Sequence, residues 1–290
     1  MGSNSKSVEI MMNYVKTTFL VIVLAAILIW IGSLLGGPRG AMIAFIVALV
    51  INGVSYWYSD RIVLRMYKAR ELMRGDHPGL FRVVEELSGR AGIPCPRIYM
   101  ADIDAPNAFA TGRDPENAAL CLTRGTLELL GDDELKGVIS HELAHIRNRD
   151  TLIMTVTAAL ASAVMMLAYM ARWAAILGGF SRDRRGSGNF IGILAVSILA
   201  PFAALLVQLA ISRSREYAAD ATGARMTKDP AGLARALENL SRFSEQRRFN
   251  AAPQTAHLFI VQPLRGGFLA NLFSTHPPVE ERIKRLRSMA

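Results

Sequence analysis

The sequence has little cysteine and little histidine, and both shortages narrow what the protein can be. Its 290 residues include two cysteines, Cys95 and Cys121, and five histidines. Two cysteines cannot form a disulfide framework, and because neither lies in a Cys-x-x-Cys pair we expect no cysteine-rich zinc knuckle. Both lie among apolar residues, so we expect two buried free thiols. Because histidines are so few, two of them at metal-binding spacing favour a metal site over a chance pairing.

Acidic residues are also few relative to basic ones. The chain has 33 Lys and Arg against 24 Asp and Glu, a formal net charge of +9. Such an excess can indicate nucleic-acid binding, but here no nucleic-acid recognition motif accompanies it. The basic residues cluster mostly beside long apolar runs, and membrane orientation explains them more simply. We therefore expect no nucleic-acid partner.

Hydrophobic residues make up 51% of the chain and concentrate in four long runs, at residues 18–35, 41–58, 151–170 and 190–211. Each run is close to the ~20 residues that a helix needs to cross a bilayer. We therefore predict about four transmembrane helices, of which the first two form a hairpin through the turn at residues 36–40. The loop between the last two runs carries four arginines, which leaves open a second pair that inserts only partly or packs on protein.

Basic residues predict the orientation of this membrane protein. The turn before the second run carries only Arg39, whereas five basic residues follow that run: Arg61, Arg65, Lys68, Arg70 and Arg74. Cytoplasmic flanks of membrane helices are enriched in Lys and Arg. We therefore expect a multi-pass protein of the lipid bilayer with everything from residue 60 onward in the cytoplasm.

The runs divide the chain into four segments. Residues 1–60 and 151–211 are predicted to form the two hairpins, and residues 61–150 and 212–290 the two parts of one soluble domain. Short strands are expected near residues 97–100, 107–110 and 118–122. Amphipathic helices are expected near residues 80–87, 132–146 and 233–240, whereas residues 246–273 resist assignment. The predicted fold is mainly α with a small β-sheet.

The motif that carries chemistry is HELAH at residues 141–145. A helix predicted to begin near Asp132 places His141 and His145 one turn apart on one face, where both can bind one Zn²⁺. Glu142 then lies beside the position of the metal that stays open, where it can accept a proton from water. The sequence therefore predicts a zinc hydrolase with one Zn²⁺ per chain.

A catalytic zinc generally has three protein ligands, so a third must be found. Glu216 is the choice, because it lies on a predicted helix just after the fourth run. Asp220 lies one turn further on the same face and can accept a hydrogen bond from a ligand histidine, which fixes the orientation of the ring. If one helix continues from His145 into the third run, the zinc lies about 10 Å from the bilayer.

HELAH, an apolar hairpin and then SREYAAD (residues 214–220) resemble the HtpX membrane protease family, relatives of the CAAX prenyl proteases. The segments APNAFA (residues 105–110) and STHPP (residues 274–278) match as well. The resemblance implies an integral-membrane zinc endopeptidase of the gluzincin type in a bacterial-type inner membrane, with its active site facing the cytoplasm. It further implies that the enzyme degrades misfolded membrane proteins and cleaves itself.

Two further roles rest on the same resemblance. His276 becomes a candidate donor to the oxyanion of the reaction, with a structural histidine at a helix entry as the alternative. Asn107, Ala108, Phe109 and Ala110 resemble an edge strand that binds substrate backbone, with an ordinary sheet strand as the alternative.

Two other functions stay open at this point. One is a processing peptidase with a single defined substrate, which the sequence does not separate from broad quality control. The other is an inactive scaffold or holdase. The presence of Glu142 argues against the scaffold, because metal binding alone needs only the ligands. A closed structural zinc site would also have four ligands rather than the three found here.

Overall fold

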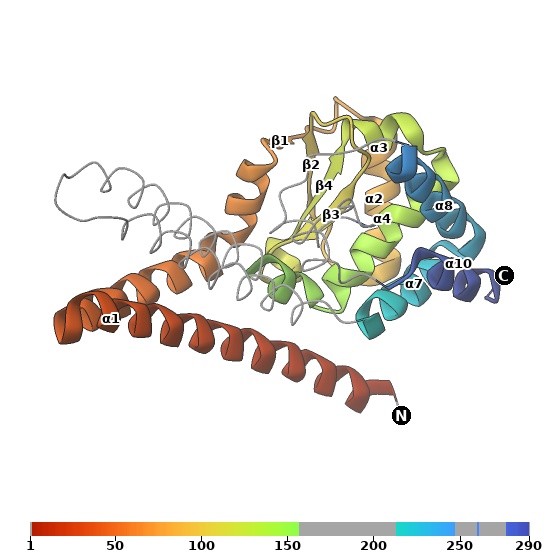
Figure 1. Cartoon of the computed structure of the whole chain (residues 1–290). Helices are drawn as coiled ribbons and strands as arrows, with labels where there is room; N and C mark the ends of the chain where they lie inside the picture. Colours follow the sequence, from red (N-terminus) through yellow and green to blue (C-terminus); the bar gives the residue numbers. More distant parts are fainter. Residues whose placement is uncertain (1, 157–212, 247–259, 261–276, 290) are drawn as a thin grey trace.

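The structure is a computed structural model that describes residues 2–156, 213–246, 260 and 277–289. Most of the third run and all of the fourth therefore lie outside the described residues, as does His276. The membrane crossing expected of these two runs and the role expected of His276 stay predictions. The described chain is mostly helical with one small mixed sheet, as the sequence predicts (Figure 1).

Helix α1 (Gly2–Met66) includes both amino-terminal apolar runs and folds back on itself near its middle (Figure 1). Gly37 has a φ of 58° there, a conformation that glycine adopts without the steric cost of a side chain. Pro38 follows and lacks the N–H that a regular helix needs. The second half of α1 then leads to the sheet.

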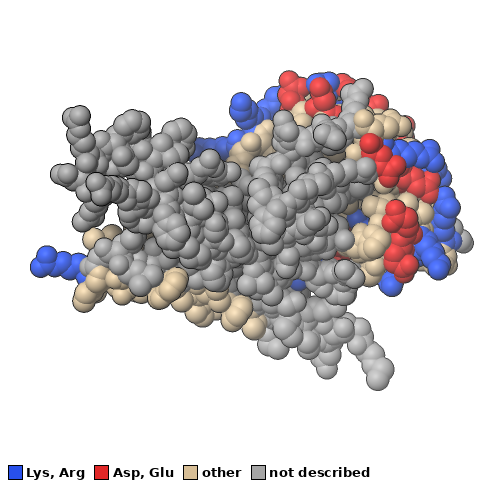
Figure 2. Space-filling model, viewed as in Figure 1, with Lys and Arg blue, Asp and Glu red and all other residues tan. Residues whose placement is uncertain are grey.

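The structure gives one candidate membrane span within its described residues, Gly37–Tyr58, with 22 residues and a mean hydropathy of 1.8. The sequence predicts about four spans, and the described residues contain one segment that is long and apolar enough. Large apolar side chains on this segment, such as Ile43 and Leu49, point away from the protein. Figure 2 shows the visible described part of α1 as largely uncharged, whereas acidic and basic side chains gather at the right of the view, over the soluble part of the chain.

The sheet has four strands in the order β1-β2-β4-β3, which places β3 at an edge. β2 and β4 are parallel, and the other two pairs are antiparallel. The three strands that the sequence predicts are present within one or two residues, and β1 is added to them. The strands are β1 (Arg70–Glu71), β2 (Arg97–Ala101), β3 (Ala108–Thr111) and β4 (Ala119–Thr123).

Helix α4 (Asp132–Arg147) carries HELAH through the centre of the domain, with β3 on one side and α7 and α8 on another (Figure 1). Its first turn is acidic, and the Glu134 carboxylate accepts a hydrogen bond from the Gly131 N–H at 3.1 Å. Both features stabilise the amino terminus of a helix. The other elements are α2 (Pro78–Ala91), η1 (Pro115–Asn117), α3 (Arg124–Leu129), α7 (Arg213–Thr227), α8 (Pro230–Gln246) and α10 (Val279–Arg287).

Two expectations from the sequence are wrong. Cys95 is exposed, because it lies in the connection between α2 and β2, whereas Cys121 is buried in β4. The helix that carries HELAH does not continue into the third run. It ends at Arg147, Arg149 has a φ of 58°, and helical structure resumes at residue 150. The distance of about 10 Å to the bilayer assumed an unbroken helical rise and loses its basis.

Candidate metal centre

The two histidines of HELAH face each other inside the protein. His141 and His145 are buried one turn apart on α4, and their Nε2 atoms are 3.2 Å apart. Two imidazole nitrogens this close share either a proton or a metal ion, because two bare lone pairs would repel each other. A cation bound by both lone pairs is the arrangement in a metal site.

Glu216 supplies a carboxylate at the same point. Its Oε1 lies 3.5 Å from Nε2 of His145, and its Oε2 lies 3.7 Å from Nε2 of His141. One ligand atom from each of the three residues can be chosen so that all lie within 4.8 Å of one another. Ligands ~2.1 Å from a tetrahedral zinc lie about 3.4 Å apart, so the donor types and their spacing fit this ion.

A glycine allows α7 to bring Glu216 to this position. A Cβ atom on Gly223 would lie 2.9 Å from Oγ of Ser140 and 3.0 Å from the backbone nitrogen of His141. The two helices therefore pack with backbone close to backbone beside the first histidine. Glu216 and Asp220 lie on the same helix, about two turns and one turn before this contact.

Asp220 contacts the other ring nitrogen of His141. Its Oδ1 lies 2.9 Å from Nδ1. Burial alone would raise the pKa of Asp220, but the charge and the hydrogen bonds of Arg282 lower it to about 2. Asp220 therefore carries a negative charge beside His141 at neutral pH.

Arg282 is a site residue that the sequence does not predict. It is fully buried on α10, and Nε and Nη2 donate to the two oxygens of Asp220 at 2.8 and 2.7 Å. Its Nη1 also lies 3.5 Å from Oε2 of Glu216. The one sequence signal is that Arg282 lies one helical turn before the apolar Leu286, and it does not name the partner of Arg282.

Glu142 is joined to the edge strand of the sheet. Its Oε2 accepts a hydrogen bond from the backbone N–H of Ala110 in β3, at 2.8 Å. Burial raises the pKa of Glu142 above the usual value for a glutamate, and the positive charge of the histidines opposes this effect. The carboxylate is thus held between the candidate metal ligands and β3.

The other residues of the predicted substrate strand are placed differently. Ala108 and Phe109 belong to β3 and are buried, with the Phe109 ring 4.8 Å from that of Tyr67. Asn107 precedes the strand, and its side chain accepts a hydrogen bond from the backbone N–H of Ile260 at 3.2 Å. Asn107 therefore makes a structural contact at the start of β3.

His145 also has a carboxylate beside Nδ1, the ring nitrogen that does not face His141. Nδ1 of His145 lies 3.2 Å from Oδ2 of Asp150. Burial alone would lower the pKa of His145, but the hydrogen bond to Asp150 and the charge of Glu216 raise it to about 9. In the absence of a metal, His145 carries a proton at neutral pH.

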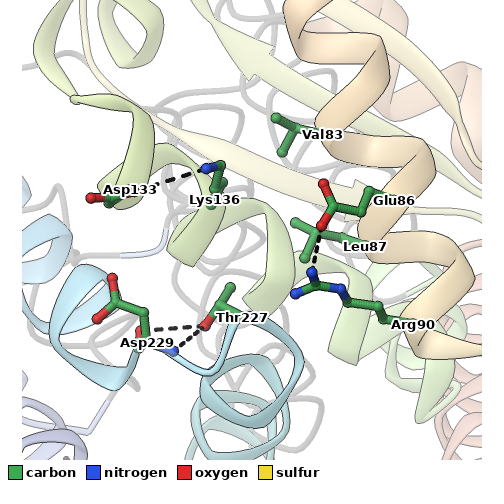
Figure 3. Close-up of a pocket in the computed structure, with 8 residues that line it drawn as sticks. All are labelled: Val83, Glu86, Leu87, Arg90, Asp133, Lys136, Thr227 and Asp229. Atoms are coloured by element: carbon green, nitrogen blue, oxygen red, sulfur yellow. Dashed lines mark hydrogen bonds and ion pairs between the residues drawn. The ribbon is translucent and has the colours of Figure 1, made fainter.

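A separate surface pocket of about 160 Å³ lies between α2, α4 and the connection from α7 to α8 (Figure 3). Its charged side chains largely contact one another, as Arg90 does with Glu86 and Lys136 with Asp133. The pocket does not include the predicted site residues. It is lined by Val83, Glu86, Leu87, Arg90, Asp133, Lys136, Thr227 and Asp229.

Residues 76–290 match the model of the family described as Peptidase family M48. The chain belongs to peptidase family M48. A protein from Syntrophobacter fumaroxidans named "Protease HtpX homolog" is 55% identical over 277 residues, which cover 94% of this chain and 98% of that protein. A protein of the same name from Thermococcus kodakarensis is 52% identical and covers 96% of each chain. The chain is therefore an HtpX-type metalloprotease of the membrane and hydrolyses peptide bonds.

Among solved structures, the chain matches one titled "Crystal Structure of S. mikatae Ste24p". The match has 18% identity and a TM-score of 0.48, and covers 97% of this chain and 64% of that one. Membership of the M48 metalloproteases implies a metal, usually zinc, and the described residues contain one group suited to it: His141, His145 and Glu216.

Proposed function

We propose that the protein is a zinc-dependent endopeptidase in which His141, His145 and Glu216 hold the ion. The observation that carries the proposal is the buried triangle of two imidazole nitrogens and a carboxylate, with edges of 3.2, 3.5 and 3.7 Å. Zinc held there supplies a Lewis acid that polarises the scissile carbonyl and lowers the pKa of water.

Glu142 performs the proton transfer. It lies next to His141 on α4 and is buried, with one oxygen held by the N–H of Ala110. The carboxylate accepts a proton from the attacking water and returns it to the departing amine. Burial raises its pKa, which favours the protonated form that the second half of the reaction needs.

The test is peptide hydrolysis by the full chain in detergent, with an unfolded protein as substrate. Glu142→Gln keeps the size of the side chain and removes the base, so turnover should fall by at least about 100-fold, the usual contribution of a general base. Glu134→Gln, on the same helix but at its exposed amino terminus, is the matched control and should retain turnover. Equal turnover by Glu142→Gln and wild type would refute the mechanism.

We infer that β3 binds the substrate backbone by strand addition. Its position at the edge of the sheet and its contact with Glu142 through Ala110 support this inference. Strand addition uses backbone hydrogen bonds. Substrate peptides methylated at single backbone nitrogens near the scissile bond should therefore lose kcat/KM, and a series with unchanged kcat/KM would exclude this binding mode.

The physiological substrates are proposed to be misfolded or damaged membrane proteins, with self-cleavage as a related activity. An unfolded segment can be extended along an edge strand, whereas a folded one must first open. In vesicles, a destabilised variant of a membrane protein should be cleaved faster than its stable parent. Cleavage of both at one site and at one rate would indicate a dedicated processing peptidase instead.

The active site is proposed to face the cytoplasm of a cell with a bacterial-type inner membrane. The basic residues that follow Gly37–Tyr58 support this orientation. Cys95 is exposed on the catalytic domain and Cys121 is buried. A membrane-impermeant maleimide at mildly alkaline pH, chosen because burial and Glu85 raise the pKa of Cys95, should label inverted vesicles and spare intact spheroplasts. Labelling of intact spheroplasts would reverse the orientation.

A further inference from the structure

The turn after HELAH brings a carboxylate back to the second histidine. In a continuous helix, a residue five positions after His145 would lie about 140° around the axis from it. Instead α4 ends at Arg147, and Arg149 has a φ of 58°. Asp150 is therefore buried against His145, with Oδ2 3.2 Å from Nδ1.

Asp150 also contacts the helix that carries Glu216. Its Oδ1 lies 3.8 Å from Nε of Arg215, the residue just before Glu216 on α7. Asp150 directly precedes residues 151–211, and Arg215 follows them by four positions. The ion pair thus joins the two chain segments that flank the second predicted hairpin, at the point where the candidate ligands meet.

The two histidines have the same kind of support. His141 contacts Asp220 through Nδ1, and Asp220 is bound by the buried Arg282. His145 contacts Asp150 through Nδ1, and Asp150 pairs with Arg215. A carboxylate at Nδ1 holds the proton on that nitrogen, so that the lone pair of Nε2 is directed to the metal.

We propose that Asp150 is a positioning residue of the zinc site. It holds His145 with Nε2 directed to the ion, and through Arg215 it fixes α7, and with it Glu216, relative to the end of α4. The inference rests on the proposed zinc site. The turn after HELAH, which carries Asp150, thus takes part in metal binding.

The experiment measures zinc affinity of the full chain in detergent by competition with a chelator. Loss of such a partner to a ligand histidine typically weakens metal binding 10- to 100-fold. Asp150→Asn, which can still accept a hydrogen bond, should lose about 10-fold, and Asp150→Ala about 100-fold. The control is Asp102→Asn, whose side chain is 85% exposed, and its zinc affinity should be unchanged. Arg215→Gln should lose less than Asp150→Asn.

Absorption of the Co²⁺-substituted protein gives a readout that a purely structural role would not change. The ligand-field bands should shift in Asp150→Asn and stay in place in Asp102→Asn. Wild-type zinc affinity and an unshifted spectrum in folded Asp150→Asn would overturn the assignment of Asp150, even if Asp150→Ala fails to fold. A folded wild-type protein without zinc affinity would instead overturn the zinc site itself, so the two failures are distinguishable.

Discussion

Helix α1 exposes large apolar side chains, whereas the catalytic domain buries charged and polar ones. On α1, Leu49 is 65% exposed and Trp57 58%. In the catalytic domain, His141 is 1% exposed and Arg282 is fully buried. A soluble protein normally buries large apolar side chains and exposes charged and polar ones. The apolar surface of α1 suits a lipid environment, and the buried polar cluster is a set of mutually paired groups around a candidate ion.

The largest effect should come from Arg282→Leu. This change removes the cation that pairs with Asp220 and contacts Glu216, and leaves two carboxylates buried without it. Breaking a buried pair in this way costs about 3–5 kcal/mol of stability. Denaturant unfolding in detergent measures the loss. Arg287→Leu, on the exposed side of the same helix, should change stability by less than about 1 kcal/mol, and similar effects of both variants would contradict a special role for the buried cluster.

Leu49→Arg tests whether the exposed apolar surface of α1 contacts lipid. A cation near the centre of a membrane helix costs about 2.5–3.5 kcal/mol of insertion free energy. We expect less protein in the alkali-resistant membrane fraction, whereas zinc affinity in detergent should not change. Leu49→Ile is the control. Normal insertion of Leu49→Arg would mean that this face of α1 does not contact lipid.

Gly223→Ala should separate α7 from α4. The added methyl group meets the backbone of Ser140 and His141, and overpacking of this kind costs about 1–3 kcal/mol. Because Glu216 and Asp220 move with α7, zinc affinity should fall together with stability. Gly89→Ala is a matched control, since a Cβ there meets nothing within 4 Å, and it should stabilise α2 slightly. Unchanged zinc affinity in Gly223→Ala would show that the close packing of α4 and α7 is not needed for the site.

The last prediction concerns the pH dependence of zinc binding. Burial alone would lower the pKa of His145, but Asp150 and Glu216 raise it to about 9 in the metal-free site. A ligand histidine must be neutral, so zinc binding near pH 7 should release about one proton from His145, and affinity should rise up to tenfold per pH unit until about pH 9. Calorimetry in buffers of different ionisation enthalpy measures the released protons. Binding that is independent of pH between about 7 and 9 would exclude a protonated His145.

The sequence predicts features whose cause is local. HELAH needs only helical spacing to bring His141 and His145 together, and the strands near residues 97 and 119 are short apolar runs. Such patterns follow from the period of a helix or a strand. The fold class and the helix that carries Glu216 could therefore be predicted from the sequence.

Two contacts of the site, those of Arg282 and Asp150, were not predicted. Arg282 pairs with Asp220 across 62 positions, and a charged carboxy-terminal helix gives no distance from which to infer this contact. Asp150 is close to His145 in sequence, but the contact between them depends on a break in the helix at Arg149. No glycine or proline at this position indicates such a break. Cys95 was misplaced because its apolar neighbours suggest burial, whereas its exposure depends on the path of a loop.

Metal content of the purified full chain tests whether His141, His145 and Glu216 hold a zinc ion. We expect about one zinc per chain in wild type and in Glu142→Gln, because Glu142 is not a ligand, and loss of zinc in Glu216→Ala. Full zinc occupancy in Glu216→Ala would contradict the proposed site by removing Glu216 from the ligands.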